Sequence, residues 1–165
     1  MNNVILIGMP GCGKSTVGVL LAKILGYSFI DSDLLIQQSE GKKLYEIINQ
    51  HGADYFKAAE NRVNSSINVS NTVIATGGSV VYCEQAMAHL KSIGKIVYIK
   101  ITPEQLVKRI NNIATRGVVI KDGETLLDLY NERAPIYEKY ADITIDSSDD
   151  SIIVNAEKIA QILNI

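Results

Sequence analysis

The sequence predicts an α/β fold in which a five-stranded parallel sheet is covered by helices on both faces. Short apolar runs of strand length alternate along the chain with longer segments whose apolar residues recur at helical spacing. Parallel strands need long crossover connections, usually helices, so this alternation indicates three layers with the sheet in the middle. The 165 residues, 47% of them hydrophobic, suffice for one buried core, and we expect residues 1–165 to form a single domain.

A glycine-rich loop joins the first expected strand, residues 4–7, to the first expected helix, which carries apolar residues from Val17 onward. Residues 8–16 read Gly-Met-Pro-Gly-Cys-Gly-Lys-Ser-Thr, which matches the phosphate-binding pattern Gly-x-x-x-x-Gly-Lys-Ser between a strand and a helix. Lys14 suits the β- and γ-phosphates of a nucleotide, and the Ser15 hydroxyl suits Mg²⁺. A purely structural turn is the alternative. The residues expected to bind the nucleotide here are Gly11, Cys12, Gly13, Lys14, Ser15 and Thr16.

The remaining elements continue the alternation of strands and helices. Further strands are expected at residues 27–30, 72–75, 95–99 and 143–145, with helices at 84–93 and 152–163. The longest connection between strands, residues 34–68, predicts a series of helices that break near Gly41 and Gly52.

Two helices are expected between the fourth and fifth strands, with a loop between them. Thr102 can cap the first helix, and Pro103 suits its first position. Residues 111–124 have little apolar periodicity and are expected to form a loop. The second helix begins near Thr125, and Pro135 is expected to kink or end it because proline lacks a backbone donor.

Two polar motifs directly follow expected strands. Asp31 and Asp33 follow the second strand, and Gly77 and Gly78 follow the third. Ligands of parallel α/β sheets bind beyond the carboxyl ends of the strands, so both motifs are expected beside the phosphate-binding loop. One carboxylate could then support a metal while the other accepts a proton from an attacking hydroxyl. The alternative is that Asp31 caps the next helix and Asp33 is a solvated charge in its first turn.

Arginines concentrate in one part of the chain. Three of the four, Arg109, Arg116 and Arg133, lie between the fourth and fifth strands. Arg116 falls in the expected loop, where a guanidinium could stabilise the charge of a transferring phosphoryl group. Arg133 could hold a carboxylate or phosphate, whereas Arg109 could also be an ordinary surface residue. The pair Lys57 and Glu60 could reach an acceptor pocket or form a surface ion pair.

Composition excludes several classes of function. The net charge of −2 and the pI near 5.7 provide no basic surface for nucleic acid or anionic membranes, and no apolar run has transmembrane length. Two cysteines are too few for a disulfide framework, and no signal segment precedes the first strand, so we expect a cytoplasmic protein. We also expect a monomer whose partners are small molecules.

Together these motifs resemble the shikimate kinase family over essentially the whole chain. The resemblance rests on residues 8–15, Asp-Ser-Asp at 31–33, Gly52-x-x-x-Phe-x-x-x-Glu, Thr-Gly-Gly at 76–78, Arg116, and Arg-Ala-Pro-Ile-Tyr at 133–137. It implies a P-loop kinase fold with strand order 2-3-1-4-5, a substrate-binding helical insertion at about 34–68 and a lid at 111–124. It also implies ATP-dependent phosphorylation of shikimate to shikimate 3-phosphate, with Mg²⁺.

The resemblance also implies roles for individual residues. Asp31, with Ser15, would assist Mg²⁺, and Asp33 would bind the acceptor hydroxyl and act as the base. The catalytic set would be Asp33, Lys14 and the lid residue Arg116, and Arg109 would lie near the adenine. The residues expected to bind the acceptor are Asp33, Lys57, Gly77, Gly78, Ser79 and Arg133.

The chain departs from the family pattern mainly on the acceptor side. Lys57 replaces an arginine, Ser79 replaces the third glycine of Gly-Gly-Gly, and the lid reads Arg-Gly-Val at 116–118 instead of Arg-Pro-Leu. Residues 147–150, Ser-Ser-Asp-Asp, replace a basic turn beside the adenine. Alternative acceptors are therefore a gluconate-like sugar acid, a polyol or a nucleoside monophosphate. If the protein is not an enzyme, the alternative is a regulatory module that binds a nucleotide without catalysis.

Overall fold

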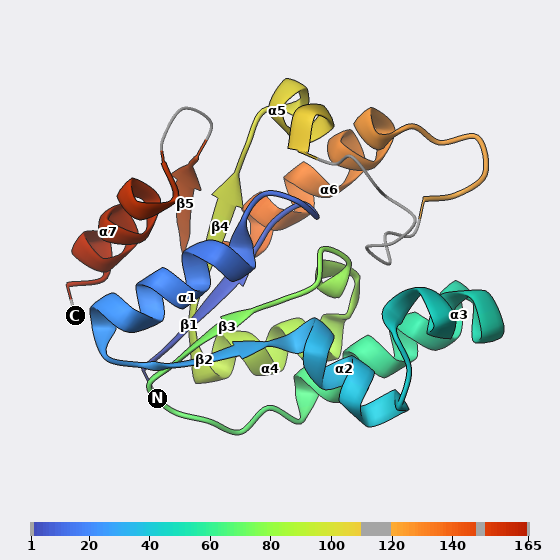
Figure 1. Cartoon of the computed structure of the whole chain (residues 1–165), viewed down its shortest axis with the longest axis horizontal. Helices are drawn as coiled ribbons and strands as arrows, with labels where there is room; N and C mark the ends of the chain where they lie inside the picture. The colour runs from blue at the N-terminus through green and yellow to red at the C-terminus, as the bar shows by residue number, and fades with distance from the viewer. Residues whose placement is uncertain (1, 110–119, 148–150, 165) are drawn as a thin grey trace.

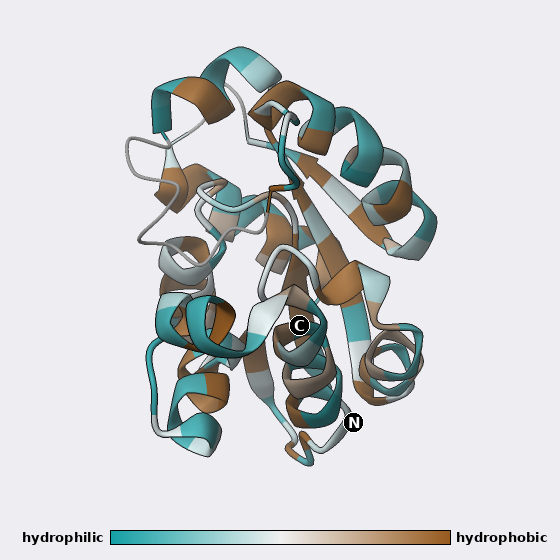
Figure 2. Cartoon of the chain, turned by 90° about the vertical axis from the view of Figure 1, so that its right-hand side faces the viewer, coloured by the Kyte–Doolittle hydropathy of each residue, from teal (hydrophilic) through white to brown (hydrophobic). Residues whose placement is uncertain are grey.

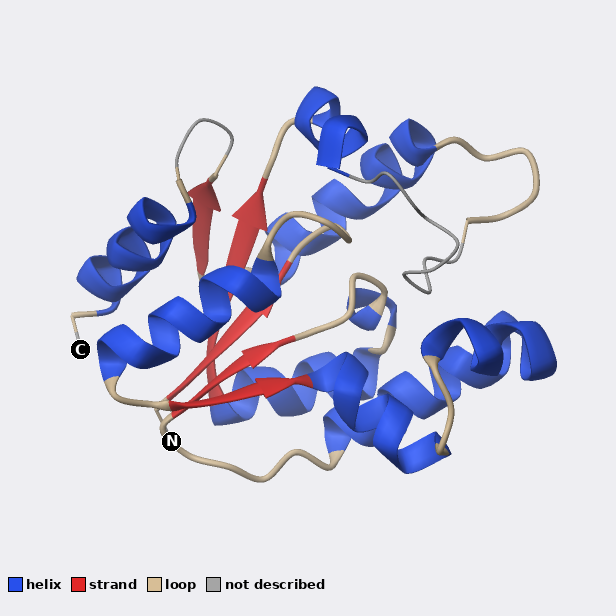
Figure 3. Ribbon diagram, viewed as in Figure 1, coloured by secondary structure: helices blue, strands red, loops and turns tan. Residues whose placement is uncertain are grey.

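The protein has a five-stranded, wholly parallel sheet with helices on both faces (Figures 1 and 3). The computed structural model describes residues 2–109, 120–147 and 151–164. The strand order is β2-β3-β1-β4-β5, which confirms the fold class and the strand order that the family resemblance implies. In chain order the strands are β1 (Asn3–Ile7), β2 (Ser28–Asp31), β3 (Thr72–Ala75), β4 (Gly94–Lys100) and β5 (Ile143–Asp146).

Helices fill each connection between strands, as the alternation predicts. Helices α1 and α7 pack against each other, and α2 packs against α3 (Figure 1). The described helices are α1 (Lys14–Leu25), α2 (Ser32–Glu40), α3 (Leu44–Ser65), α4 (Glu84–Ile93), α5 (Pro103–Arg109), α6 (Leu126–Tyr140) and α7 (Ile152–Leu163), with a 3₁₀ turn η1 (Val80–Tyr82). None of these helices is both long enough and apolar enough to span a membrane.

Buried apolar side chains form two clusters. The main one surrounds the sheet, and all five residues of β1 and all four of β3 are buried, as expected for central strands covered on both faces. Figure 2 shows the apolar strands enclosed by helices. A smaller cluster lies between α2 and α3 and consists of Ile36, Leu44, Ile47, Phe56, Ala59 and Val63. The pair α2 and α3 therefore has an apolar centre of its own.

The predicted helix breaks are confirmed at two glycines. Gly41 ends α2 in the left-handed conformation, with φ of 64° and ψ of 21°. Gly52 interrupts α3 with φ of 84° and ψ of 171°, a conformation that is essentially restricted to glycine. Pro135 does not end its helix, because α6 continues to Tyr140. The 3₁₀ turn was not predicted.

The register of the sheet brings three strand ends to one edge. Leu6 pairs with Ala75, and Asp31 pairs with the same Ala75 from the other side. The hydroxyl and the backbone N–H of Thr76 both donate to the carbonyl of Leu6, at 2.9 and 3.2 Å. The segments that leave β1, β2 and β3 therefore start side by side, which confirms the expected grouping of the polar motifs.

Candidate active site

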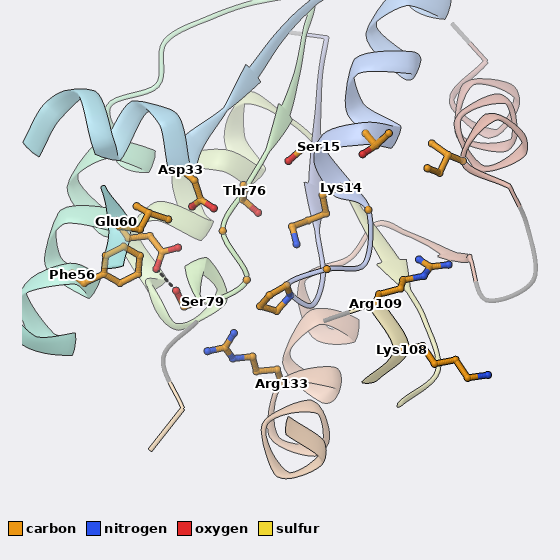
Figure 4. A pocket seen from close by; sticks show the side chains of 18 residues that line it. Lys14, Ser15, Asp33, Phe56, Glu60, Thr76, Ser79, Lys108, Arg109 and Arg133 are labelled. Atoms are coloured by element: carbon orange, nitrogen blue, oxygen red, sulfur yellow. Dashed lines mark hydrogen bonds between the residues drawn. The ribbon is translucent and has the colours of Figure 1, made fainter. Parts of the chain in front are cut away.

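A cavity of about 740 Å³ lies at this edge of the sheet (Figure 4). It extends between the phosphate-binding loop, the N-terminal end of α2, the loop after β3, and helices α3, α5 and α6. The lining residues that matter for chemistry are Gly11, Gly13, Lys14, Ser15, Thr16, Asp33, Glu60, Gly77, Gly78, Ser79, Lys108, Arg109 and Arg133. Most of the site predicted from sequence is thus gathered in one place.

The phosphate-binding loop depends on its glycines and on Lys14. Gly8 has φ of 147°, and a Cβ there would lie 2.6 Å from the carbonyl oxygen of Ile99, so only glycine fits. Gly13 is left-handed, with φ of 100°, immediately before α1. The ammonium of Lys14 is buried and donates to the carbonyls of Gly8 and Met9, at 2.8 and 2.9 Å. The loop thus combines the unpaired N–H groups of a helix start with a cation, as an anion site requires.

Ser15 and Asp31 form a pair of hard oxygen donors. The hydroxyl of Ser15 donates to Oδ2 of Asp31 at 2.7 Å. Oδ1 of Asp31 accepts from the backbone N–H of Asp33 at 3.0 Å, so Asp31 also caps α2. The structure thus shows the cap, which uses only Oδ1, so it does not exclude a metal role for Oδ2. No cluster of three or more His, Cys, Asp or Glu side chains suited to a metal occurs among the described residues. The hydroxyl of Ser15 and the carboxylate of Asp31 fit Mg²⁺, which prefers oxygen ligands and typically uses one or two protein ligands together with substrate phosphates.

Two carboxylates face the cavity, one from α2 and one from α3. Burial, together with the nearby Asp31, raises the pKa of Asp33 to about 6, and the charge of Lys14 opposes this rise. Glu60 is fully buried, and burial raises its pKa to about 7. Such pKa values are typical of groups that exchange protons near neutral pH.

The glycine pair after β3 allows close packing around these carboxylates. A Cβ at Gly77 would lie 2.6 Å from Oε1 of Glu60 and 2.8 Å from Oδ1 of Asp33. A Cβ at Gly78 would lie 2.7 Å from Cδ of Pro10 and 3.2 Å from Nη1 of Arg133. A side chain at Gly77 would therefore collide with the two carboxylates, and one at Gly78 would collide with Pro10 and crowd Arg133.

Arg133 supplies a buried cation to the cavity from helix α6. Its guanidinium carbon lies 5.3 Å from the centre of the Tyr82 ring, and only 3% of the residue is exposed. One turn later on α6, the hydroxyl of Tyr137 donates to the carbonyl of Gly78 at 2.6 Å. Figure 4 shows Arg133 on the opposite side of the cavity from Lys14, with Asp33 and Glu60 on a third side.

Arg109 and Lys108 line the other end of the cavity, at the end of α5. Nη1 of Arg109 donates to the carbonyl of Cys12 in the phosphate-binding loop at 3.3 Å. Ile152, at the start of α7, also lines the cavity. Lys108 was not singled out in the sequence, because a lysine near a helix end is usually an ordinary surface residue.

Some predicted residues do not reach the cavity. Lys57 is exposed, and its ammonium lies 5.8 Å from the centre of the Tyr82 ring. Phe56 and Glu60 are four residues apart and share the inner face of α3, which leaves Lys57 rotated outward. The side chain of Cys12 is buried in the core, so only its backbone is available to a nucleotide. Arg116 lies outside the described residues, as does most of the expected lid at 111–124.

Glu60 and Tyr137 are the site residues that sequence reasoning underestimated. Glu60 was paired with Lys57 as a surface alternative, but its hydrogen bond in the structure goes to the hydroxyl of Ser79, at 2.6 Å. The signal available in the sequence was the spacing of Phe56 and Glu60 on one helical face. Nothing in the sequence indicated the contact between Tyr137 and Gly78, because it joins positions 59 residues apart.

A parallel sheet of this order, with a phosphate-binding loop after β1 that lines a cavity shared with carboxylates and a buried arginine, is typical of P-loop phosphotransferases. Comparison with known proteins identifies the family. The sequence model described as "Shikimate kinase" matches residues 10–164. A shikimate kinase of Clostridium botulinum (strain 657 / Type Ba4) is 38% identical over 158 residues, which cover 93% of each chain. The chain belongs to the shikimate kinase family.

Solved structures agree with this assignment. The shikimate kinase of Acinetobacter baumannii, in complex with shikimate, superposes with a TM-score of 0.88 at 31% identity, covering 99% of this chain and 93% of that one. The shikimate kinase of Aquifex aeolicus vf5 superposes with a TM-score of 0.84 at 32% identity, covering 98% of this chain and 96% of that one.

Proposed function

We propose that this protein transfers the γ-phosphoryl group of ATP to a hydroxyl of shikimate, giving shikimate 3-phosphate and ADP. The observation that carries the proposal is the layout of one cavity. Lys14 and Ser15 lie at its nucleotide end, and Asp33 and Arg133 lie at its acceptor end. Membership of the shikimate kinase family supports shikimate as the acceptor.

The phosphate-binding loop holds the donor. Its N–H groups and the start of α1 bind the β- and γ-phosphates, and Lys14 exchanges its bonds to loop carbonyls for bonds to phosphate oxygens. Ser15 and Asp31 would hold Mg²⁺, which neutralises charge on the β- and γ-phosphates when bound. Arg109, whose guanidinium contacts the loop, borders the adenine in this proposal. Arg116 would close over the transferred group.

Asp33 performs the proton transfer. Its carboxylate accepts the proton of the acceptor hydroxyl as the hydroxyl oxygen forms a bond to the γ-phosphorus. The bond between that phosphorus and the β,γ-bridging oxygen breaks, and ADP leaves with the bridging oxygen. The Oδ1 atom of Asp33 accepts no hydrogen bond from any residue that the structure describes. It is therefore available to a substrate hydroxyl.

Arg133 recognises the acceptor carboxylate. A planar guanidinium can form two parallel hydrogen bonds to a carboxylate, and the contact between Arg133 and the Tyr82 ring helps to hold the guanidinium in place. Gly77 and Gly78 border the bound ring without side chains of their own. Lys57 lies outside the cavity lining in this structure, and we propose no direct contact for it.

The proposal extends to the organisation of the chain. Residues 1–165 would act as one kinase domain, with 34–68 as the acceptor-binding insertion and 111–124 as the lid. We further propose a monomeric enzyme of the cytoplasm. Its two cysteines, Cys12 and Cys83, are free and buried, which is consistent with a reducing compartment.

An ADP-release assay with a panel of acceptors tests the proposed function. Purified protein with Mg-ATP is mixed with shikimate, gluconate, a polyol or a nucleoside monophosphate, and product formation is checked by mass. We expect turnover with shikimate at least 100 times faster than with the other acceptors. A stronger response to gluconate or to a nucleoside monophosphate would reassign the acceptor and leave the kinase chemistry standing. ATP binding without turnover on any acceptor would favour a regulatory module.

A further inference from the structure

Glu60 is a buried carboxylate whose partner in the structure is not a cation. An ionised carboxylate that is fully buried needs hydrogen bonds to offset its lost hydration. Lys57, one turn earlier on α3, is exposed and faces the Tyr82 ring instead. The donor to Oε2 of Glu60 is the hydroxyl of Ser79, at 2.6 Å, which is the dashed contact in Figure 4. Ser79 therefore takes a role that a cation on α3 could otherwise fill.

The second oxygen of Glu60 lies beside Gly77, and both residues line the cavity. Oε1 is buried and accepts no hydrogen bond from the described part of the chain, and the same holds for Oδ1 of Asp33. Both oxygens lie within 3 Å of the point where a Cβ of Gly77 would stand, at 2.6 and 2.8 Å. Glycine at 77 thus leaves two acceptor oxygens side by side, which suits a ligand with more than one hydroxyl.

The charges around Glu60 are mixed. Burial and, to a lesser extent, Asp33 on α2 raise the pKa of Glu60 and favour its neutral form, whereas Arg133 on α6 and Lys14 on α1 favour its ionised form. The hydrogen bond from Ser79 also lowers the pKa of Glu60 and so opposes the effect of burial. A hydroxyl that donates to Oε2 leaves Oε1 free as an acceptor, and it does so without neutralising the carboxylate as a bound cation would.

We propose that Ser79 is a positioning residue for the acceptor, whose hydroxyl holds Glu60 so that Oε1 accepts a second substrate hydroxyl beside the one at Asp33. This inference rests on the proposed phosphorylation of shikimate. It assigns a function to the serine that stands where the family pattern has glycine. It also explains how the acceptor end is organised while Lys57 points outward.

Kinetics of Ser79→Ala test the positioning role. Removing the hydroxyl should raise the KM for shikimate about tenfold, the scale of a hydrogen bond to a charged group, with the KM for ATP unchanged and kcat within threefold. Ser79→Thr keeps the hydroxyl and should restore the wild-type KM. Ser65→Ala is the matched control, because the Ser65 hydroxyl has no partner among the described residues and lies outside the cavity. An unchanged shikimate KM in Ser79→Ala would overturn the proposal, as would an equal rise in the KM for ATP.

A titration of the free protein separates this inference from the proposed function. The ¹³C signal of the Glu60 carboxyl is assigned with Glu60→Gln and followed against pH without any substrate. Ser79→Ala should move its midpoint to higher pH than wild type, whereas Ser79→Thr should not, because only the alanine variant loses the donor. An unshifted midpoint in the alanine variant would overturn the inference even if shikimate is phosphorylated. Absence of turnover with shikimate, alongside a shifted midpoint, would contradict the proposed function alone.

Discussion

Asp33 lies in the first turn of α2, and its side chain lines the cavity. Its backbone N–H is held by Asp31 at the start of α2, which fixes where the side chain emerges. Its carboxylate then lies between the phosphate-binding loop and the loop after β3 (Figure 4). The backbone of Asp33 thus serves stability while its side chain stays available for the proposed proton transfer.

The Asp33→Asn variant should lose turnover and keep nucleotide affinity. The amide has nearly the same shape but cannot accept the hydroxyl proton, and general-base catalysis contributes about 10² to 10⁴ in rate. We expect kcat to fall by at least 100-fold while the dissociation constant for Mg-ATP stays within threefold, measured by calorimetry. Near-normal kcat would remove Asp33 from the role of base.

Glu60 illustrates the cost of a buried carboxylate for stability. Burial raises its pKa from 4.5 to about 7, so between these values the folded chain holds a proton that the unfolded chain has released. The free energy of unfolding therefore falls as the pH rises through that window. Above pH 7 Glu60 is ionised in the folded chain too, and its burial then destabilises the fold by the full amount.

The Glu60→Gln variant should consequently be more stable than wild type at pH 8, by roughly 1–3 kcal/mol, with the advantage shrinking at pH 5. Urea unfolding at the two pH values measures the difference. The exposed Glu157→Gln provides the control and should change the free energy of unfolding by less than about 0.5 kcal/mol at both. A glutamine variant that is less stable at pH 8 would contradict the penalty assigned to Glu60.

Helix α6 connects the two halves of the site. Arg133 and Tyr137 lie one turn apart on its inner face, and both are buried. The Tyr137 ring stacks on Tyr98 of β4, with ring centres 5.1 Å apart. The Tyr137 hydroxyl reaches Gly78 at 2.6 Å, and it also lies 3.8 Å from the sulfur of Met9 in the phosphate-binding loop. One side chain thus contacts both the phosphate-binding loop and the loop after β3.

Removing the Tyr137 hydroxyl should make the loop after β3 more mobile, because its hydrogen bond to the Gly78 carbonyl is lost. For Tyr137→Phe we expect kcat/KM for shikimate to fall about tenfold and the free energy of unfolding to fall by about 1 kcal/mol. Tyr98→Phe is the matched control, since it alters the same ring stack but removes a hydroxyl without a partner in the described residues. Steady-state kinetics on both variants measure kcat/KM for shikimate. Equal decreases in the two variants would show that the ring stack, and not the hydrogen bond to Gly78, is responsible.

At the scale of the whole molecule, ligand binding should report on assembly of the site. The cavity is bordered by segments from most of the fold, so a ligand there binds the folded chain only. Mg-ATP at about 100 times its dissociation constant should add about 2.7 kcal/mol of stability, or about 5 to 10 °C in Tm for a chain of this length.

A thermal shift assay measures this effect. Chelation of Mg²⁺ with EDTA should remove most of the shift, because Ser15 and Asp31 would then face the phosphates without a cation between them. An equal shift with and without Mg²⁺ would contradict the metal role of that pair.

The sequence determined the order of the elements and the nucleotide half of the site. Strand and helix periodicity is a local property of the sequence. The phosphate-binding loop is one contiguous segment, so the conformation of residues 8–16 can be predicted from that segment alone. In a parallel sheet ligands bind at the carboxyl ends of the strands, so the positions of Asp31, Asp33 and the glycine pair directly after strands are enough to predict that they share one edge.

The acceptor half was decided only by the tertiary structure. Whether Lys57 or Glu60 faces the cavity depends on how α3 is rotated against α2, and that is set by apolar packing around Phe56 and Ile36. The partners of Glu60 and Gly78 are Ser79 and Tyr137, which lie on other segments. A local pattern cannot specify such pairings, because they arise from the packing of whole elements against one another.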